Sequence, residues 1–249
     1  MPRRDIMNPL TVTIDGPAGL GKSTVARSLA ARLGIPYLNS GALYRAVAWK
    51  VSKRGIKPND EAGVLDLCKQ TEFVLVGPDN DQSVVIDGTR LTHELWTPHV
   101  SLVASEVSRL PSVRAFLRPI QRQCGNNQGV VAEGRDMGTH VFVDAEVKVF
   151  LDASPTVRAR RRFRELQSRD AAVSWERTAS ELTERDNRDT TRDAAPLRPS
   201  PDATMIDTSD LSASQVVDAI LALIRQEQAR PQVEPTPPVD TTKRTQSSY

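Results

Sequence analysis

The sequence has few cysteine, histidine and aromatic residues. Its 249 residues include two cysteines, three histidines and only 4% aromatic residues. Cys68 and Cys124 show neither a C-x-x-C spacing nor a histidine at zinc-ligand spacing. A disulfide or a zinc site is therefore less expected than two reduced thiols. The low aromatic content also leaves few platforms on which nucleic-acid bases could stack.

Long apolar runs are also missing. No run of about 18 apolar residues occurs, which argues against a membrane-spanning helix. The first residues, Met1 to Asp5, lack the apolar core of a signal peptide. We therefore expect a chain that is neither inserted into a membrane nor exported, and that works in the cytoplasm. Its 39% hydrophobic content is enough to bury a substantial core.

Lysine is scarce beside arginine. The chain has 26 arginines and seven lysines against 31 acidic residues, for a net charge of +2. The planar arginine fork binds phosphate oxygens in a bidentate way and stays charged at any working pH. The excess of arginine therefore suits phosphate ligands. A compositional bias of the genome explains part of it, because most charged residues only solvate a face.

A glycine-rich loop is the most informative motif. Residues 16–23 read GPAGLGKS, which matches G-x-x-x-x-G-K-S/T, and they follow the apolar run Thr11–Asp15 and precede a predicted helix at 24–33. In such a loop the backbone N–H groups cradle the β-phosphate, the lysine reaches the β- and γ-phosphates, and the serine hydroxyl faces Mg²⁺. The alternative is a glycine-rich turn that only starts a helix. We expect a nucleotide site with Mg²⁺ at Ser23, formed by Gly16, Pro17, Ala18, Gly19, Leu20, Gly21, Lys22, Ser23 and Thr24.

Further strands alternate with helices. Apolar runs at 129–132, 147–151 and 203–206 are separated by helical segments, as in a doubly wound parallel sheet. Nucleotide sites in such sheets lie at the carboxyl ends of the strands. The glycine loop and a turn predicted at Glu133–Asp136 both fall there. The sequence thus predicts an α/β fold with a parallel-sheet P-loop core.

A second, smaller sheet is predicted within this order. Strand patterns occur at 73–76, 84–86 and 89–91, and Asp87-Gly88 is a strong hairpin signal. We interpret about 70–92 as a small antiparallel sheet inserted into the core, followed by helices at 100–110 and 112–123. After a last amphipathic helix at 214–228, residues 231–249 are rich in Pro, Thr, Ser and Gln, and we expect them to be disordered.

Four further segments carry a resemblance to a known family. They are NSGALYR at 39–45, Arg114, EGRDMGT at 133–139 and RDNRDTTR at 185–192. With the glycine loop, they make the chain resemble the bacterial cytidylate kinase family from about Leu10 to Arg225. The resemblance implies a nucleoside monophosphate kinase domain at 10–230. Its expected parts are a core at 10–38, 129–153 and 200–229, an NMP-binding insert at about 39–125, and an Arg-rich helical lid at about 155–195.

The resemblance implies ATP-dependent phosphorylation of CMP and dCMP in pyrimidine nucleotide metabolism. Cytosine would be recognised by Ser40, Arg114 and Asp136, and the acceptor phosphate would be held by Arg45 and Arg135. The remaining expected CMP contacts, some of them to ribose and phosphate, are Tyr44, Arg185, Asp189 and Arg192. Asn39 and Glu133 depart from the family pattern, since many members carry Asp at both positions.

The expected chemistry needs no general base. An acceptor phosphate is already ionised, so phosphoryl transfer rests on positioning and charge neutralisation, and we expect the three histidines to be surface or packing residues. A predicted helix starting near Ser154-Pro155 carries five arginines within 158–164. A solvated face is the ordinary explanation; the resemblance places the helix in the lid. The expected catalytic residues are Lys22, Arg135, Arg158, Arg162 and Arg185.

Three other functions compete with this hypothesis. Another P-loop kinase of small metabolites, of the shikimate type, would share the loop but lack the inserted sheet. A GTP-binding switch would need an Asn-Lys-x-Asp element, which the sequence does not contain. Nucleic-acid binding is prompted by the arginine-rich helix, but acidic residues are interleaved throughout 158–193. We therefore expect ATP and CMP or dCMP as ligands, no nucleic acid or membrane partner, and a monomer.

Overall fold

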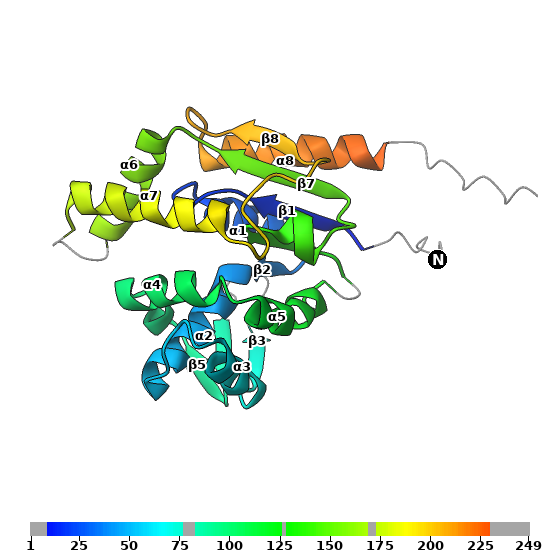
Figure 1. Ribbon diagram of the computed structural model, residues 1–249. Helices are drawn as coiled ribbons and strands as arrows, with labels where there is room; N and C mark the ends of the chain where they lie inside the picture. Colours follow the sequence, from blue (N-terminus) through cyan, green and yellow to red (C-terminus); the bar gives the residue numbers. More distant parts are fainter. Residues whose placement is uncertain (1–8, 77–82, 126–127, 169–172, 230–249) are drawn as a thin grey trace, which may run out of the picture.

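The computed structural model describes residues 9–76, 83–125, 128–168 and 173–229. Figure 1 shows a central sheet with helices packed along it, and below it a helical part that carries a second, small sheet. The segment 231–249, for which disorder is predicted, lies outside the described residues.

The central sheet is parallel and has the strand order β2-β6-β1-β7-β8. β1 lies in the middle, and its residues from Thr11 to Asp15 pair in register with Val130 to Gly134 of β6. The predicted parallel core is therefore confirmed. Its strands are β1 (Thr11–Asp15), β2 (Tyr37–Asn39), β6 (Val130–Gly134), β7 (Val147–Asp152) and β8 (Thr204–Asp207).

The turn predicted at Glu133–Asp136 is partly wrong. Glu133 and Gly134 still belong to β6, because pairing with Ile14 and Asp15 of β1 extends the ladder by two residues. The chain leaves the strand only at Arg135, and a short π-helical turn, η2 (Met137–Val141), follows. Glu133 thus lies on the rigid sheet, while Arg135 and Asp136 lie just beyond its carboxyl edge.

Two helices bury one face of this sheet. α1 (Lys22–Leu33) follows the glycine loop, and α8 (Ala213–Gln228) closes the described part of the chain. Leu29 and Ile220 pack with Ile14 and Leu151 in one apolar cluster in which each of these side chains is fully buried. Burying such a side chain contributes roughly 1.5–3 kcal/mol relative to exposure. The glycine loop is therefore fixed between a buried strand and a buried helix.

The lower part in Figure 1 is a helical layer with its own core. The small sheet β3-β4-β5 is antiparallel, as predicted, and the Asp87-Gly88 turn has positive φ at both residues, 47° and 78°. This part contains α2 (Ser40–Arg54), α3 (Glu61–Lys69), β3 (Phe73–Val76), β4 (Ser83–Ile86), β5 (Thr89–Leu91), the 3₁₀ turn η1 (His93–Trp96), α4 (Pro98–Val107) and α5 (Pro111–Gln123).

Two further helices stand beside the carboxyl ends of β1 and β7 (Figure 1). α6 (Pro155–Gln167) begins at the predicted place, with the Ser154 side chain accepting a hydrogen bond from Val157 N. α7 is Trp175–Thr191. α6 approaches the glycine loop so closely that a Cβ at Gly19 would lie 2.6 Å from the Arg158 carbonyl oxygen. The predicted bounds of core, insert and lid remain predictions.

In the part of the chain that the structure describes, no helix combines the length and the apolar character that crossing a bilayer requires.

Candidate active site

The glycine loop forms an anion-binding turn at the start of α1. Gly21 is the N-cap residue of the helix and has a left-handed φ of 73°. The N-terminus of a helix presents N–H groups and a partial positive charge, so it attracts phosphate. Lys22 is buried in the same turn, and its Nζ donates to the Pro17 carbonyl oxygen at 2.5 Å. Burial and the nearby Arg135 lower the Lys22 pKa well below its usual range.

Ser23 meets a carboxylate beside this lysine. The Ser23 hydroxyl donates to Glu133 Oε1 at 2.5 Å, and the Tyr37 hydroxyl donates to the same oxygen at 3.0 Å. The strand order explains the meeting, since β6 lies between β1 and β2. A hydroxyl and a carboxylate are oxygen ligands of the kind that Mg²⁺ prefers, together with water and nucleotide phosphates. The residues at this point therefore fit Mg²⁺.

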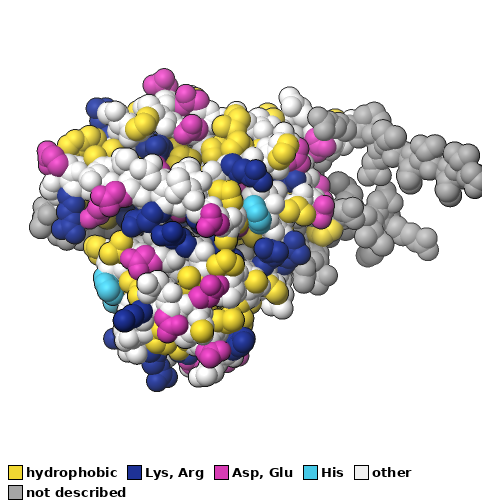
Figure 2. Space-filling model, in the orientation of Figure 1, with side chains coloured by type: hydrophobic (Ala, Val, Ile, Leu, Met, Phe, Trp, Pro, Cys, Tyr) yellow, Lys and Arg dark blue, Asp and Glu magenta, His cyan; other side chains and the backbone are white. Residues whose placement is uncertain are grey.

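Arginines converge on the space next to the loop. Arg135 Nε donates to Asp189 Oδ2 at 2.9 Å, whereas the buried Nε atom of the half-buried Arg185 has no hydrogen-bond partner among the described residues. Burial, reinforced by Arg135, lowers the Arg185 pKa to about 10. Burial together with Arg185 and Arg162 also lowers the Arg45 pKa, to about 9. Basic side chains gather between α7 and α4 on the face shown in Figure 2. This concentration of buried positive charge favours a polyanionic ligand.

A buried ion pair lies beside the arginines. Arg114 of α5 pairs with Asp136, and both side chains are about 6% exposed. The Arg114 guanidinium also donates to the Ser108 carbonyl oxygen and stacks over the Tyr44 ring at 5.3 Å. The Ser40 hydroxyl donates to the Glu133 carbonyl oxygen at 2.8 Å. Fixed donors and acceptors of this kind can recognise the edge of a base.

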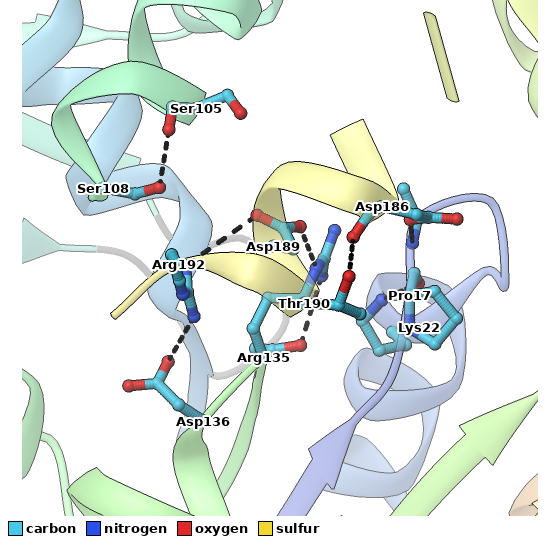
Figure 3. Close-up of polar contacts among 12 residues, drawn as sticks. Pro17, Lys22, Ser105, Ser108, Arg135, Asp136, Asp186, Asp189, Thr190 and Arg192 are labelled. Carbon is cyan, nitrogen blue, oxygen red and sulfur yellow. Dashed lines mark hydrogen bonds and ion pairs between the residues drawn. The ribbon is translucent and has the colours of Figure 1, made fainter. Parts of the chain in front are cut away.

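Arg192 lies between the Arg114–Asp136 ion pair and the arginine cluster, which consists of Arg45, Arg135 and Arg185. Its guanidinium lies 3.9 Å from Asp136 Oδ1 and 3.8 Å from Asp189 Oδ1. Figure 3 shows Arg192 between these two carboxylates, with Arg135 on the other side of Asp189. Six of the residues expected to bind CMP therefore form one connected network, namely Tyr44, Arg114, Arg135, Asp136, Asp189 and Arg192. We infer that a ligand here would meet both the ion pair and the cations.

The two arginines of α6 that are expected in the lid have different contacts. Arg158 pairs with Asp186 of α7, and the other Asp186 oxygen accepts a hydrogen bond from Ala18 N of the glycine loop at 3.2 Å. Arg162 pairs with Glu165 of its own helix at 2.8 Å. The ion-pair partner of Arg158 thus also contacts the loop.

Three residues absent from the expected set also belong to this region. Asp15 is buried at the end of β1 and accepts hydrogen bonds from Met137 N and Gly138 N at 2.9 and 2.8 Å. Its position at the carboxyl end of a strand was a usable signal. Asp186 lies in the segment 185–192 that carries the family resemblance, between the expected CMP contacts Arg185 and Asp189. Trp96 had no signal in the sequence.

A cavity of about 390 Å³ opens on the outer side of the loop. It lies between the loop, α6 and the start of α8. Its walls combine aliphatic and polar side chains, among them Leu20, Val25, Arg161, Thr208 and Leu211. The volume and the mixed lining suit a small organic ring system.

Comparisons with known proteins agree with this geometry. The family model described as cytidylate kinase matches residues 12–226. The chain is 44% identical over 215 residues to a cytidylate kinase of Fervidobacterium nodosum, with 86% of this chain and 96% of that protein covered. It is 46% identical over 218 residues to a bifunctional pantoate ligase/cytidylate kinase of Synechococcus sp. strain JA-3-3Ab. This match covers 86% of this chain but only 40% of the relative's length.

A solved gluconokinase structure from Sinorhizobium meliloti shares 16% identity and a TM-score of 0.46, covering 88% of this chain and 94% of that one. At such values the likeness carries no argument about this chain. The family model carries one, because it matches from β1 into α8, and so does the Fervidobacterium nodosum relative, because it is 44% identical and 96% of its length is covered. The chain therefore belongs to the cytidylate kinase family.

Proposed function

We propose that this protein transfers the γ-phosphoryl group of ATP to CMP and dCMP, giving ADP and CDP or dCDP. The observation that carries the proposal is the buried Arg114–Asp136 pair next to the arginine cluster and Lys22. A phosphate-transfer site with base-specific polar groups beside it suits a nucleotide acceptor. The names of the relatives point to the same activity.

ATP would bind on the loop side. The loop N–H groups and Lys22 would hold the β- and γ-phosphates. The neighbouring cavity of about 390 Å³ would take the adenine ring. Ser23 and Glu133 would hold Mg²⁺, directly or through water, and the ion would neutralise charge on the β- and γ-oxygens.

CMP would bind on the ion-pair side. The cytosine amine donates, and its ring N3 and O2 accept, so a carboxylate and an arginine fork complement it. Asp136 and Ser40 would supply the acceptors and Arg114 the donors. Uracil reverses this pattern at two positions. A site that leaves buried polar groups unpaired with the wrong base can discriminate by ~10⁴-fold or more.

The transfer would be direct and in line. The attacking oxygen belongs to the CMP phosphate, which is ionised near neutral pH, so no side chain needs to remove a proton. Arg45 and Arg135 would hold that phosphate. Lys22, Arg185 and the lid residues Arg158 and Arg162 would neutralise charge on the group in transit. Closure of α6 and α7 would exclude water and so prevent hydrolysis of ATP.

Continuous measurement of ADP formation from MgATP tests the proposal. CMP, dCMP, UMP, AMP and GMP are offered separately, with shikimate as an unrelated acceptor. Rapid turnover confined to CMP and dCMP is the expected result. Lys22→Ala is the control, because it should lower this turnover by several orders of magnitude without unfolding the chain. Turnover of shikimate with inert nucleotides would overturn the acceptor assignment.

We further propose that the enzyme acts as a monomer in the cytoplasm, where its nucleotide substrates are available. Light scattering at assay concentrations should give the mass of one chain. A dimer that persists on dilution would contradict the monomer.

A further inference from the structure

A tryptophan ring covers one of the arginines of the proposed acceptor site. Trp96 ends η1, and its ring centroid lies 4.8 Å from Cζ of Arg45 on α2. Arg45 is 7% exposed, whereas Trp96 is 40% exposed. The indole therefore lies between the buried guanidinium and solvent. An indole ring is the strongest of the aromatic partners for a cation.

Arg45 is held by neutral groups. Its Nη1 donates to the Leu95 carbonyl oxygen at 3.0 Å and to Ser101 Oγ at 2.6 Å. Ser101 Oγ in turn donates to the Thr97 carbonyl oxygen at 2.8 Å, so its lone pair is directed to Arg45. Both hydrogen bonds of Arg45 in the described part of the chain leave from Nη1. The rest of the fork remains for an incoming phosphate oxygen.

The arginines around Arg45 repel its guanidinium. Arg185, Arg162 and Arg135 all act on it as like charges, and Glu165 acts on it in the opposite sense. Before an anion binds, the guanidinium needs neutral groups that stabilise it without neutralising it. A ring face does this, because its quadrupole attracts the cation and competes less with phosphate than a carboxylate would.

We propose that Trp96 is a positioning residue for the acceptor phosphate: its ring holds the Arg45 guanidinium in place for the phosphate of the incoming nucleotide. The inference rests on the proposed function, because it takes Arg45 as a phosphate ligand. All the groups that hold Arg45 belong to the short segment from Leu95 to Ser101. That segment, which runs from the end of η1 into the first turn of α4, thereby sets the geometry of the phosphate site.

Calorimetric titration of the full chain with CMP and with cytidine tests the role. Trp96→Leu should weaken CMP binding by about threefold to thirtyfold, the range expected for losing a partly desolvated cation–π contact. Cytidine lacks the phosphate, so its affinity should not change. Trp96→Phe retains a ring face and should restore part of the CMP affinity. Trp175→Leu is the matched control, since Trp175 is similarly exposed, at 36%, and packs on Phe163 of the lid.

Coupling to Arg45 gives the second arm of the test. In an Arg45→Met background, adding Trp96→Leu should cause no further loss of CMP affinity, because Trp96 acts through Arg45. In steady-state kinetics Trp96→Leu should raise the KM for CMP and leave the KM for ATP unchanged. Unaltered urea midpoints would show that folding is intact.

The inference is overturned if Trp96→Leu binds CMP like the wild type, or if it weakens CMP and cytidine equally. An additive loss in the Arg45→Met background would overturn it as well. Failure of the proposed function looks different, because the wild-type protein would then show no turnover with CMP.

Discussion

Recognition of the base depends, on our proposal, on the buried Arg114–Asp136 ion pair together with Ser40. Arg114 is held by Asp136, by the Ser108 carbonyl oxygen and by the face of Tyr44. Replacing it with Met would leave Asp136 with the more distant Arg192 as its cation, at 3.9 Å. Arg114 therefore affects the base site much more than it affects the glycine loop.

Arg114→Met should raise the KM for CMP by about tenfold to a hundredfold, the effect of losing a hydrogen bond to a charged group. The KM for ATP should change little. Initial-rate kinetics with each substrate varied in turn measures both values. Arg118→Met, one turn further along α5, is the control and should resemble the wild type. Equal changes in both KM values would show that Arg114 does not recognise the base.

Asp15 couples the loop to the base site. It accepts two backbone hydrogen bonds from the start of η2, directly after Asp136. Burial raises the pKa of Asp15 from 3.8 to about 6, although these two bonds favour the charged form. The folded protein therefore keeps a proton on Asp15 between about pH 4 and 6, where the unfolded chain has lost it.

The free energy of unfolding contributed by Asp15 should accordingly fall as pH rises from 4 to 6. A shift of about two units corresponds to about 3 kcal/mol. Urea unfolding of the wild type and of Asp15→Asn at pH 4, 5, 6 and 7 measures the effect. As pH rises through this range, the wild type should lose about 3 kcal/mol of unfolding free energy relative to Asp15→Asn. Parallel pH profiles would mean that the ionisation of Asp15 is not linked to folding.

At the scale of elements, charged side chains of α6 and α7 contact the glycine loop. Asp186 of α7 pairs with Arg158 of α6 and accepts from Ala18 N, and Arg158 also donates to the Ala18 carbonyl oxygen at 3.4 Å. The Asp186 carboxylate thus accepts a hydrogen bond from a loop N–H group near the expected phosphates. ATP binding would have to displace it.

Asp186→Ala should therefore bind ATP more tightly, by about fivefold, because the loop N–H group is no longer occupied and a negative charge is removed. Equilibrium titration with a fluorescent ATP analogue measures the affinity. Glu184→Ala removes an exposed carboxylate from the same helix and controls for charge alone. An unchanged or weaker affinity would show that Asp186 does not compete with nucleotide.

At the scale of the whole molecule, the expected site residues come from three parts: the carboxyl edge of the central sheet with the glycine loop, the helical part that contains α2 and α5, and the helices α6 and α7. The residues proposed to bind ATP and CMP extend along the sequence from Gly16 to Arg192. α8 adds Val217 and Ile220 to the apolar core of the central sheet. The segment 231–249 follows this helix and contributes no residue to the expected site.

Truncation after Arg230 should leave kcat and both KM values unchanged. Truncation after Ser212 is the contrasting variant, because it removes all of α8 and its four buried side chains, Val216, Val217, Ile220 and Ile224. That variant should fail to fold, since each lost side chain contributes about 1.5–3 kcal/mol. The assay with MgATP and CMP, together with circular dichroism, measures both outcomes. A large loss of turnover on removing 231–249 alone would contradict the prediction.

Local features of this protein were determined by the sequence itself. The glycine loop, the Asp87-Gly88 hairpin and the start of α6 at Ser154-Pro155 each depend on the backbone preferences of a few neighbouring residues. The strand–helix alternation predicted the parallel core for a similar reason, since apolar periodicity reflects burial on one face. The family followed from motifs in unbroken order.

Only the tertiary structure decided which distant groups meet. Asp15 contacts Gly138, Ala18 contacts Asp186, and Trp96 covers Arg45 because of strand order and helix packing. The end of β6 depended on pairing too, since register with β1 drew Glu133 and Gly134 into the sheet. Such contacts join residues from 51 to 168 positions apart, and no local preference of the chain can specify a partner at that separation.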